Sequence, residues 1–425
     1  MRLLVAAFGS VFLDRDSISC RLSDGLNGYQ QILMADKAFV TPEILKWARV
    51  TARISADDAA SKVPVPTERL EEWESGISQP TIRQAEKLAK AYKRPFALFF
   101  LSEVPRDFQP LQDFRRWGSE PLGTASIFII REMQQKQDWI SDEFKTNGEP
   151  KLGFVGAFSI ADDPAKVAEN ILSTLQISPG SYFGTSPLRE WIDRAEAKGV
   201  FVSRTSFIHS RMKLDSDEFQ GFAIADPYAP FVFINSDDWD APCLFTLVHE
   251  LAHLWIAESG ISNVGEPEIA GNTEMPHVEL FCNEVAANAL MPTELMRSFP
   301  PSTFESTNEI FKCARVLGVS TFAFLVRSYK LSLIGLNTYR YLKNQADKEF
   351  AAYKKREAGR IALQKASENK GGPSYYLLQV NKNGRLFTQI VLDAYNGGFI
   401  EPTQASSLLN VKVNNFKGLE SQLYK

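Results

Sequence analysis

Cysteine and histidine are scarce in this chain of 425 residues, which contains 4 of each. The cysteines, Cys20, Cys243, Cys282 and Cys313, lie far apart and form no C-x-x-C pair. This spacing excludes a disulfide framework and a zinc finger built on paired cysteines. We therefore expect reduced thiols and a cytoplasmic protein.

Long apolar runs and an excess of charge of one sign are also absent. No apolar run reaches the roughly 18 residues that a transmembrane helix needs, so we expect no membrane partner. The formal net charge is only -4, so binding to nucleic acid would have to come from a local basic patch. The chain is 44% hydrophobic, which is typical of a globular protein with a sizeable core.

The first 40 residues carry little regular pattern. MRLLVAAFGSVFL is apolar but lacks a convincing small-x-small cleavage site, and the twenty residues after it are polar and unpatterned. Patterned sequence begins just after Met34. We interpret residues 1–40 as a disordered extension or a mis-called leader, with either Met1 or Met34 as the true start, and exclude them from the fold prediction.

The spacing of apolar residues predicts a mainly helical protein with a small β-sheet, of the α+β class. Residues 41–101 read as an all-α module of five short helices, and 102–152 as a linker followed by a long helix. Residues 153–335 combine helices with a strand pair in GFAIADPYAPFVFIN. Residues 336–425 begin with a basic helix and continue as a largely helical small α/β region, in which Asn383-Gly384 predicts a hairpin turn.

The stretch FTLVHELAHLW holds two of the 4 histidines on a strongly apolar helix. His249 and His253 are four residues apart, so both imidazoles lie on one face and can bind one cation. Glu250 is rotated by about 100° from His249 and can reach a water on that cation. This spacing predicts two zinc ligands and a general base, whereas the alternative is a pair of incidental helical histidines.

A catalytic zinc needs a third protein ligand and one open position. Acidic side chains and one histidine downstream are the candidates: Glu266, Glu268, Glu274, His277, Glu279 and Glu284. Glu279 and Glu284 lie on the next predicted helix, and spacing alone does not choose between them.

HELAHLW, followed by ELFCNEVAANALMP, resembles the ImmA/IrrE family of metallopeptidases over about Gly153 to Ile334. The resemblance places the third metal ligand at Glu279 and departs from the family pattern at Val285 and Ala289. It implies a zincin-like domain with one Zn²⁺ per chain, although the same ligands accept Mn²⁺ or Fe²⁺. It further implies an endopeptidase that cleaves a partner transcriptional regulator, often a repressor.

That reaction also needs an oxyanion donor besides the metal. Tyr228 and His209 are the candidates for this role, and each has a purely structural role as its alternative.

ISADDAASKVPVPTERLEEWESGISQPTIRQAEKLAKAY resembles the XRE/Cro-type helix-turn-helix family. The resemblance rests on four residues: Trp73, Glu74, Gly76 and Pro80. It implies a recognition helix that places Thr67, Glu68 and Arg69 on base edges. Residues 66–74 contain one Arg against four Glu, however, so DNA reading and a protein-docking or dimerising role both stay open.

Residues 340–370 form a predicted basic helix with nine Lys or Arg against four acids, a second candidate surface for DNA. Its alternative is an ordinary solvated face. Two competing functions remain: a DNA-binding regulator or antitoxin-like factor with a structural or vestigial metal site, and a nucleic-acid sensor whose basic helix gates the peptidase. A homodimer is a further expectation, since such helix-turn-helix proteins commonly act as dimers.

Overall fold

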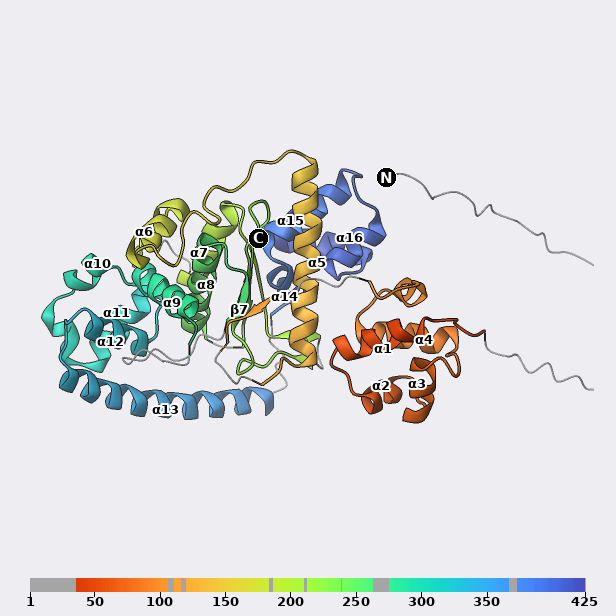
Figure 1. The fold of residues 1–425 in the computed structure, drawn as a ribbon. Coiled ribbons are helices and arrows are strands. Elements are labelled where there is room, and N and C mark those ends of the chain that lie inside the picture. The colour runs from red at the N-terminus through yellow and green to blue at the C-terminus, as the bar shows by residue number, and fades with distance from the viewer. Residues whose placement is uncertain are drawn as a thin grey trace, which may run out of the picture.

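The computed structural model describes residues 36–105, 111–115, 120–182, 186–209, 212–237, 239–262, 275–366 and 373–424. An N-terminal helical module is followed by a small mixed sheet with helices on both faces (Figure 1). The predicted α+β class is therefore confirmed. None of the helices in these ranges is both long enough and apolar enough to span a membrane.

The N-terminal module is built from five short helices, as the sequence predicted. They are α1 (Pro42–Thr51), α2 (Ala56–Lys62), α3 (Thr67–Glu74), α4 (Ile82–Tyr92) and the 3-10 helix η1 (Phe96–Phe100). Ser55 begins α2 by accepting a hydrogen bond from the N–H of Asp58. Thr81 and Gln84 form a capping box at the start of α4. Local capping signals therefore place these helices.

The sheet has the strand order β1-β7-β5-β6-β2. Its strands are β1 (Gln112–Asp113), β2 (Phe201–Thr205), β5 (Gly221–Ile224), β6 (Phe231–Asn235) and β7 (Gly260–Ser262), beside a separate pair of β3 (Phe207–His209) and β4 (Met212–Lys213). β5 and β6 are antiparallel neighbours, as predicted, whereas β2 pairs with β6 and β1 with β7 in parallel. The two strands at the β1 end of the sheet, β1 and β7, come from the linker and from the segment after the helix that carries His249 and His253.

Alternation of side chains gives the sheet two buried faces. Val202, Val232 and Ile234 belong to one hydrophobic core, and Phe201 and Phe231 belong to the other. Because both faces are covered, every residue of β5 and β6 is buried. The strand residues therefore fix the sheet between two helical layers.

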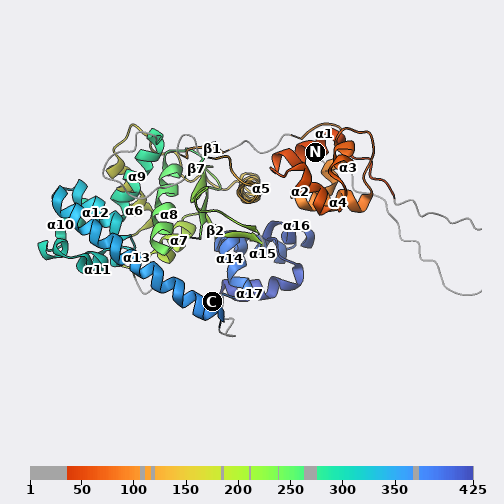
Figure 2. The same ribbon diagram turned by 90° about the horizontal axis from the view of Figure 1, so that it is seen from below.

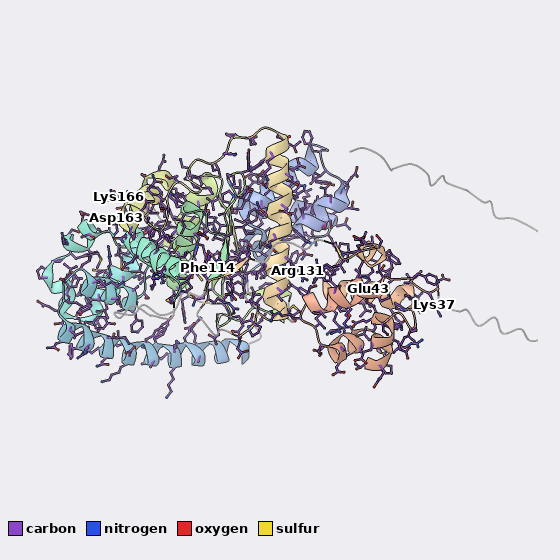
Figure 3. All side chains as sticks on the ribbon, viewed as in Figure 1. Lys37, Glu43, Phe114, Arg131, Asp163 and Lys166 are labelled. Carbon is purple, nitrogen blue, oxygen red and sulfur yellow. The ribbon has the colours of Figure 1, made fainter. Side chains whose placement is uncertain are left out.

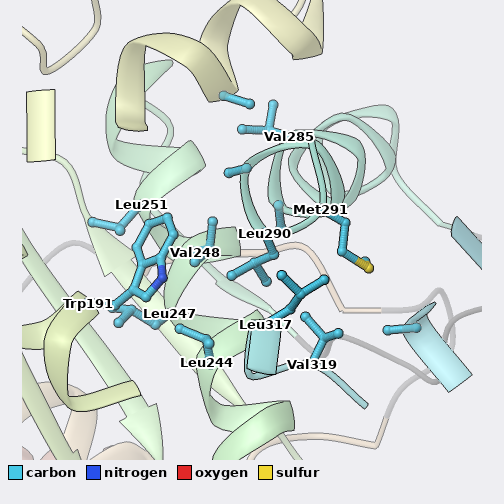
Figure 4. Close-up of a cluster of buried hydrophobic side chains, with 14 of the residues drawn as sticks. Trp191, Leu244, Leu247, Val248, Leu251, Val285, Leu290, Met291, Leu317 and Val319 are labelled. Atoms are coloured by element: carbon cyan, nitrogen blue, oxygen red, sulfur yellow. The ribbon is translucent and has the colours of Figure 1, made fainter. Parts of the chain in front are cut away.

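The first face is covered by the helices that carry the candidate metal ligands. This layer consists of α6 (Pro164–Leu175), α7 (Pro187–Ala197), α8 (Asp240–Trp255), α9 (His277–Leu290), α10 (Thr293–Ser298), η2 (Pro301–Glu305), α11 (Thr307–Leu317), α12 (Thr321–Lys330) and α13 (Leu336–Ala366). Figure 4 shows Leu244, Leu247 and Val248 packed between Trp191 and Leu290. Since burial of apolar area is the main stabilising term, this core holds α8 and α9 together.

The second face is covered by α5 (Thr124–Thr146) and by the C-terminal helices α14 (Tyr375–Asn383), α15 (Arg385–Asn396), α16 (Pro402–Leu409), η3 (Val413–Asn415) and α17 (Phe416–Leu423). Figures 1 and 2 both place α14 and α15 beside α5 at this face. α5 matches the long helix that the sequence predicted after the linker.

The predicted C-terminal hairpin is wrong, and with it the small α/β description of this region. Residues 373–424 contain helices and no strand. Gly384 joins α14 to α15 with a φ of +83°, so the Asn383-Gly384 pair is a helix junction. Ser374 caps α14 by accepting from the N–H of Leu377, and Phe387 and Val391 are buried at helical spacing. These helix signals outweigh the hairpin dipeptide.

Candidate metal centre

The candidate centre lies between α8 and α9, with the strand β7 beside it. α8 contributes His249, Glu250 and His253, and α9 contributes Glu279. All four side chains are 0% exposed. Two helices that are separate in the sequence thus bring together the residues that the sequence analysis singled out.

Three of these side chains converge on one point. The Nε2 atoms of His249 and His253 are 3.1 Å apart. The Glu279 carboxylate lies 3.1 Å from His253 Nε2 through Oε1 and 3.2 Å from His249 Nε2 through Oε2. Ligand atoms of a tetrahedral zinc, each about 2.0–2.1 Å from the metal, are about 3.3 Å apart. The spacing of the three groups therefore fits a zinc-sized cation.

Polar neighbours orient these three groups. The amide oxygen of Asn283 lies 3.0 Å from His249 Nδ1, which fixes the ring so that Nε2 faces Glu279. The Ser262 hydroxyl on β7 donates to Glu279 Oε1 at 3.2 Å and lies 3.3 Å from His253 Nε2. Asn283 belongs to the pattern that carried the family resemblance, whereas Ser262 had no signal in the sequence.

Glu250 differs from its neighbours because its carboxyl group makes no hydrogen bond of good geometry with a described residue, although the Ser262 hydroxyl lies near enough to oppose the rise in its pKa. Within the described part of the chain, neither of its carboxylate oxygens has a hydrogen-bonding partner. The start of β5 passes directly over it, since a Cβ built on Gly221 would lie 2.9 Å from Glu250 Oε1. A buried acceptor without a donor is unfavourable unless a ligand supplies the donor.

The surroundings shift the protonation of these groups in different directions. Burial, reinforced by the charge of Glu279, raises the pKa of Glu250 well above its usual value. Burial would also raise the pKa of Glu279, but the two histidines outweigh it and lower that pKa to about 2. Burial lowers the pKa of His253. Neutral imidazole and ionised carboxylate are the forms that bind a metal cation.

Cys282 is a further donor that the sequence analysis missed. Its thiol, together with ring nitrogens of His249 and His253, forms a buried group whose ligand atoms all lie within 4.8 Å of one another. Glu279 is the better third ligand, because its oxygens lie 3.1 and 3.2 Å from the imidazoles and its low pKa keeps it ionised. Burial raises the pKa of Cys282 well above its usual value, which favours the thiol over the metal-binding thiolate.

The other candidate ligands lie elsewhere. Glu284 points away on α9 and forms an ion pair with Lys330 at 2.7 Å. His277 is exposed at the first position of α9. The remaining acidic candidates, Glu266, Glu268 and Glu274, fall outside the described residues.

The oxyanion donors suggested by the sequence gain no support. Tyr228 lies in the turn after β5, at the opposite end of that strand from Gly221 and Glu250, so the structure does not bring it to the centre. The ammonium groups of Lys145 and Lys151 instead lie over its ring in cation–π contacts. The side chain of His209 falls outside the described part.

Two of the three residues expected to contact DNA interact with other side chains of the same domain. Thr67 donates a hydrogen bond to Asp57 at 2.6 Å, and Arg69 pairs with Glu72. Glu68 is exposed and adds negative charge to the same helix.

The second candidate DNA surface lies on α13. Every residue from 351 to 360 on this helix is exposed except Glu357. Arg360 pairs with Glu357, but the other basic side chains of that stretch have no ion-pair partner among the described residues. Among the described residues, α13 therefore presents more basic side chains without an ion-pair partner than α3 does.

Two family models match parts of the chain. Residues 195–329, which include both α8 and α9, match the family model described as the IrrE N-terminal-like domain, Peptidase M78. Residues 45–99 match the helix-turn-helix family model. No curated protein matches the chain. Residues 45–99 thus resemble a helix-turn-helix domain and residues 195–329 an IrrE-like domain, in the order that the sequence analysis expected.

Proposed function

We propose that the protein is a zinc-dependent endopeptidase that cleaves a partner transcriptional regulator. The observation that carries this proposal is the buried triangle of His249, His253 and Glu279 beside an unpartnered Glu250. A purely structural metal site has no need of that fourth, unpartnered carboxylate. The family match to a peptidase supports the same reading.

The residues divide the chemistry between them. His249, His253 and Glu279 would hold the cation, and the site residues also suit Mn²⁺ or Fe²⁺. A bound zinc supplies Lewis acidity, which makes a water more acidic and a peptide carbonyl more electrophilic. Glu250 accepts the proton of the attacking water and delivers it to the leaving amine. Burial raises its pKa, which makes its ionised form a stronger proton acceptor.

The helix-turn-helix domain supports a substrate linked to transcription. A domain of this kind brings the peptidase to DNA or to another regulator. The acidic face of α3 favours a protein partner over direct base reading, because phosphates favour Lys and Arg. Cleavage of a repressor near its operator would then change gene expression.

The test is cleavage of candidate repressors by purified protein with added zinc. Wild type is compared with Glu250→Gln, which keeps all three metal-binding side chains, and with Glu284→Gln as a matched control on α9. Discrete cleavage by wild type and Glu284→Gln, absent in Glu250→Gln and abolished by a chelator, supports the proposal. Metal binding without any cleavage would favour a regulator whose metal site is structural.

A further inference from the structure

A peptidase must admit a polypeptide, yet this site is closed. His249, Glu250, His253 and Glu279 are all 0% exposed. Something that covers them therefore has to move before a substrate can enter. Among the described residues, the covering groups on the β7 side come from the linker that follows the helix-turn-helix domain.

We call residues 112–115 of this linker the linker strap. Its strand β1 pairs in parallel with β7, and the N–H of Phe114 continues the ladder by donating to Ile261 O at 3.0 Å. The Phe114 ring stacks on the ring of His253, with centroids 5.4 Å apart and planes 17° from parallel. Figure 3 shows Phe114 in the middle of the domain. The strap thus places an aromatic side chain directly on a candidate metal ligand.

Gly260 on β7 is shaped for this occupant. A Cβ built there would lie 2.2 Å from two atoms of the Phe114 ring and 2.9 Å from Gln112 O. Glycine therefore lets the strap approach β7 closely, while the backbone there needs no glycine for its own conformation.

The strap is tied to the rest of the molecule at its end. The guanidinium of Arg115 pairs with Asp113 at 2.7 Å and donates to Glu218 O at 3.2 Å. The Glu218 carboxylate in turn accepts hydrogen bonds from the N–H of Gly123 and the hydroxyl of Ser126, at the start of α5. These hydrogen bonds therefore couple a displacement at the start of α5 to the strap.

α5 also holds the helix-turn-helix domain. Arg131 and Thr124 donate to the carbonyls of Thr51 and Arg53, at 2.6 and 3.0 Å. Thr51 is the last residue of α1, and Arg53 follows shortly after it. Figure 3 shows Arg131 on the side of α5 that faces the helix-turn-helix domain. A partner that moves this domain thus has a mechanical connection to the strap.

We propose that the linker strap occupies the path by which an extended substrate reaches the metal centre, so that the protein is latent until the strap leaves β7. The inference rests on the proposed function. An extended segment of the partner protein then pairs with the freed edge of β7 by β-augmentation. The space left by Phe114 favours an aromatic side chain in that segment.

The test opens the strap from both sides. Phe114→Ala removes the aromatic ring that covers His253. Gly260→Ala adds a Cβ on β7 that displaces the strap while the sequence of the strap stays the same. Phe399→Ala removes an aromatic ring that is 83% exposed and serves as the matched control. Access is read from the rate at which Cys282 is alkylated in metal-stripped protein, resolved by mass spectrometry. Cys243, which is buried in the same hydrophobic core, reports general unfolding.

We expect Cys282 to react at least about tenfold faster in both strap variants, equivalent to about 1.4 kcal/mol, with Cys243 and the control unchanged. Trypsin should also cut sooner after Arg115. Unchanged Cys282 reactivity in both variants overturns the inference.

With zinc restored, cleavage of the partner should also rise in both strap variants. Opening of the site with unchanged or slower cleavage contradicts latency. If the strap variants open the site but no variant, wild type included, cleaves the partner, the proposed function is wrong. The strap would still be shown to cover the site, because alkylation of Cys282 requires neither metal nor catalysis.

Discussion

Two buried clusters of charged side chains look alike and behave differently. One joins Glu132 and Lys136 of α5 to Lys382 of α14, and the other is the candidate metal centre. Each contains a glutamate whose pKa is lowered to about 2, Glu132 in the first cluster and Glu279 in the second. Burial or a perturbed pKa alone therefore does not mark a functional site here.

The clusters differ in how fully their polar atoms are paired. Glu132 receives Lys136 at 2.9 Å and Lys382 at 3.0 Å, one on each oxygen, and Lys136 also donates to Asn383 at 2.7 Å. In the metal centre, both oxygens of Glu250 lack partners among the described residues. A satisfied cluster fixes α14 onto α5, whereas an unsatisfied one is suited to bind something that is not part of the chain.

The largest effect that we expect is on catalysis. Glu250→Gln removes the general base and should lower kcat about 100- to 10,000-fold, because proton transfer by a positioned side chain contributes about that much. Zinc content should stay unchanged, and metal-free protein should become slightly more stable, since the unpartnered buried carboxylate is gone. Steady-state kinetics and urea unfolding measure both, and wild-type rates in this variant would mean that another group takes the proton.

The matching change in the other cluster should act on stability. Glu132→Gln leaves two buried ammonium groups without their counter-ion and should lower the free energy of unfolding by about 3–5 kcal/mol. Glu143→Gln on the same helix is the control, because Glu143 is in no ion pair among the described residues. Urea titration checks both, and equal midpoints for the two variants would show that the cluster does not stabilise the fold.

The two signs of pKa shift also predict opposite pH dependences. The pKa of Glu132 is lowered from 4.5 to about 2, so its stabilisation is present above pH about 4.5 and is lost as the pH falls towards 2. Burial raises the pKa of Glu196 from 4.5 to about 7, although its carboxylate accepts the N–H of Leu386. Stability from this group is therefore lost as the pH rises from about 4.5 to 7.

Glu196→Gln isolates the second effect. The variant keeps an acceptor for Leu386 but does not ionise, so at pH 8 it should be more stable than wild type by up to about 3 kcal/mol. At pH 4 the two should be nearly equal. Unfolding measured at both pH values decides the point, and an advantage that does not depend on pH would contradict it.

The smallest effect should come from the strand above Glu250. Gly221→Ala brings a Cβ to 2.7 Å from the Thr246 side chain and 2.9 Å from Glu250, and should destabilise the domain by about 1–3 kcal/mol. Gly153→Ala is the control, since a Cβ there meets nothing within 4 Å. Thermal unfolding compares them, and equal behaviour would show that β5 can move away from Glu250.

Local patterns were enough to predict some of this molecule. The apolar helix with His249 and His253, the capped helices of the first domain and the β5–β6 pair all depend on neighbours in sequence. Spacing did not separate Glu279 from Glu284, because that choice depends on how α9 packs against α8. The family resemblance supplied Glu279, and the fold places it against the histidines.

Features that depend on distant contacts escaped prediction. Phe114, Ser262 and Cys282 reach the centre from the linker, from β7 and from the inner face of α9, and none lies in a pattern that marks it. The Asn383-Gly384 pair carried a strong local hairpin signal, yet the helix cap at Ser374 and packing against the sheet turned that segment into two helices. Tertiary packing decided each of these cases.

The most direct test of the central claim is the metal content of purified protein. Wild type, Glu250→Gln and Glu284→Gln should each contain about one zinc per chain, and Glu279→Ala and His249→Ala should contain none. That result would assign the buried triangle as the ligand set. No metal in the wild type after zinc is added, or full zinc content in Glu279→Ala, would contradict the account.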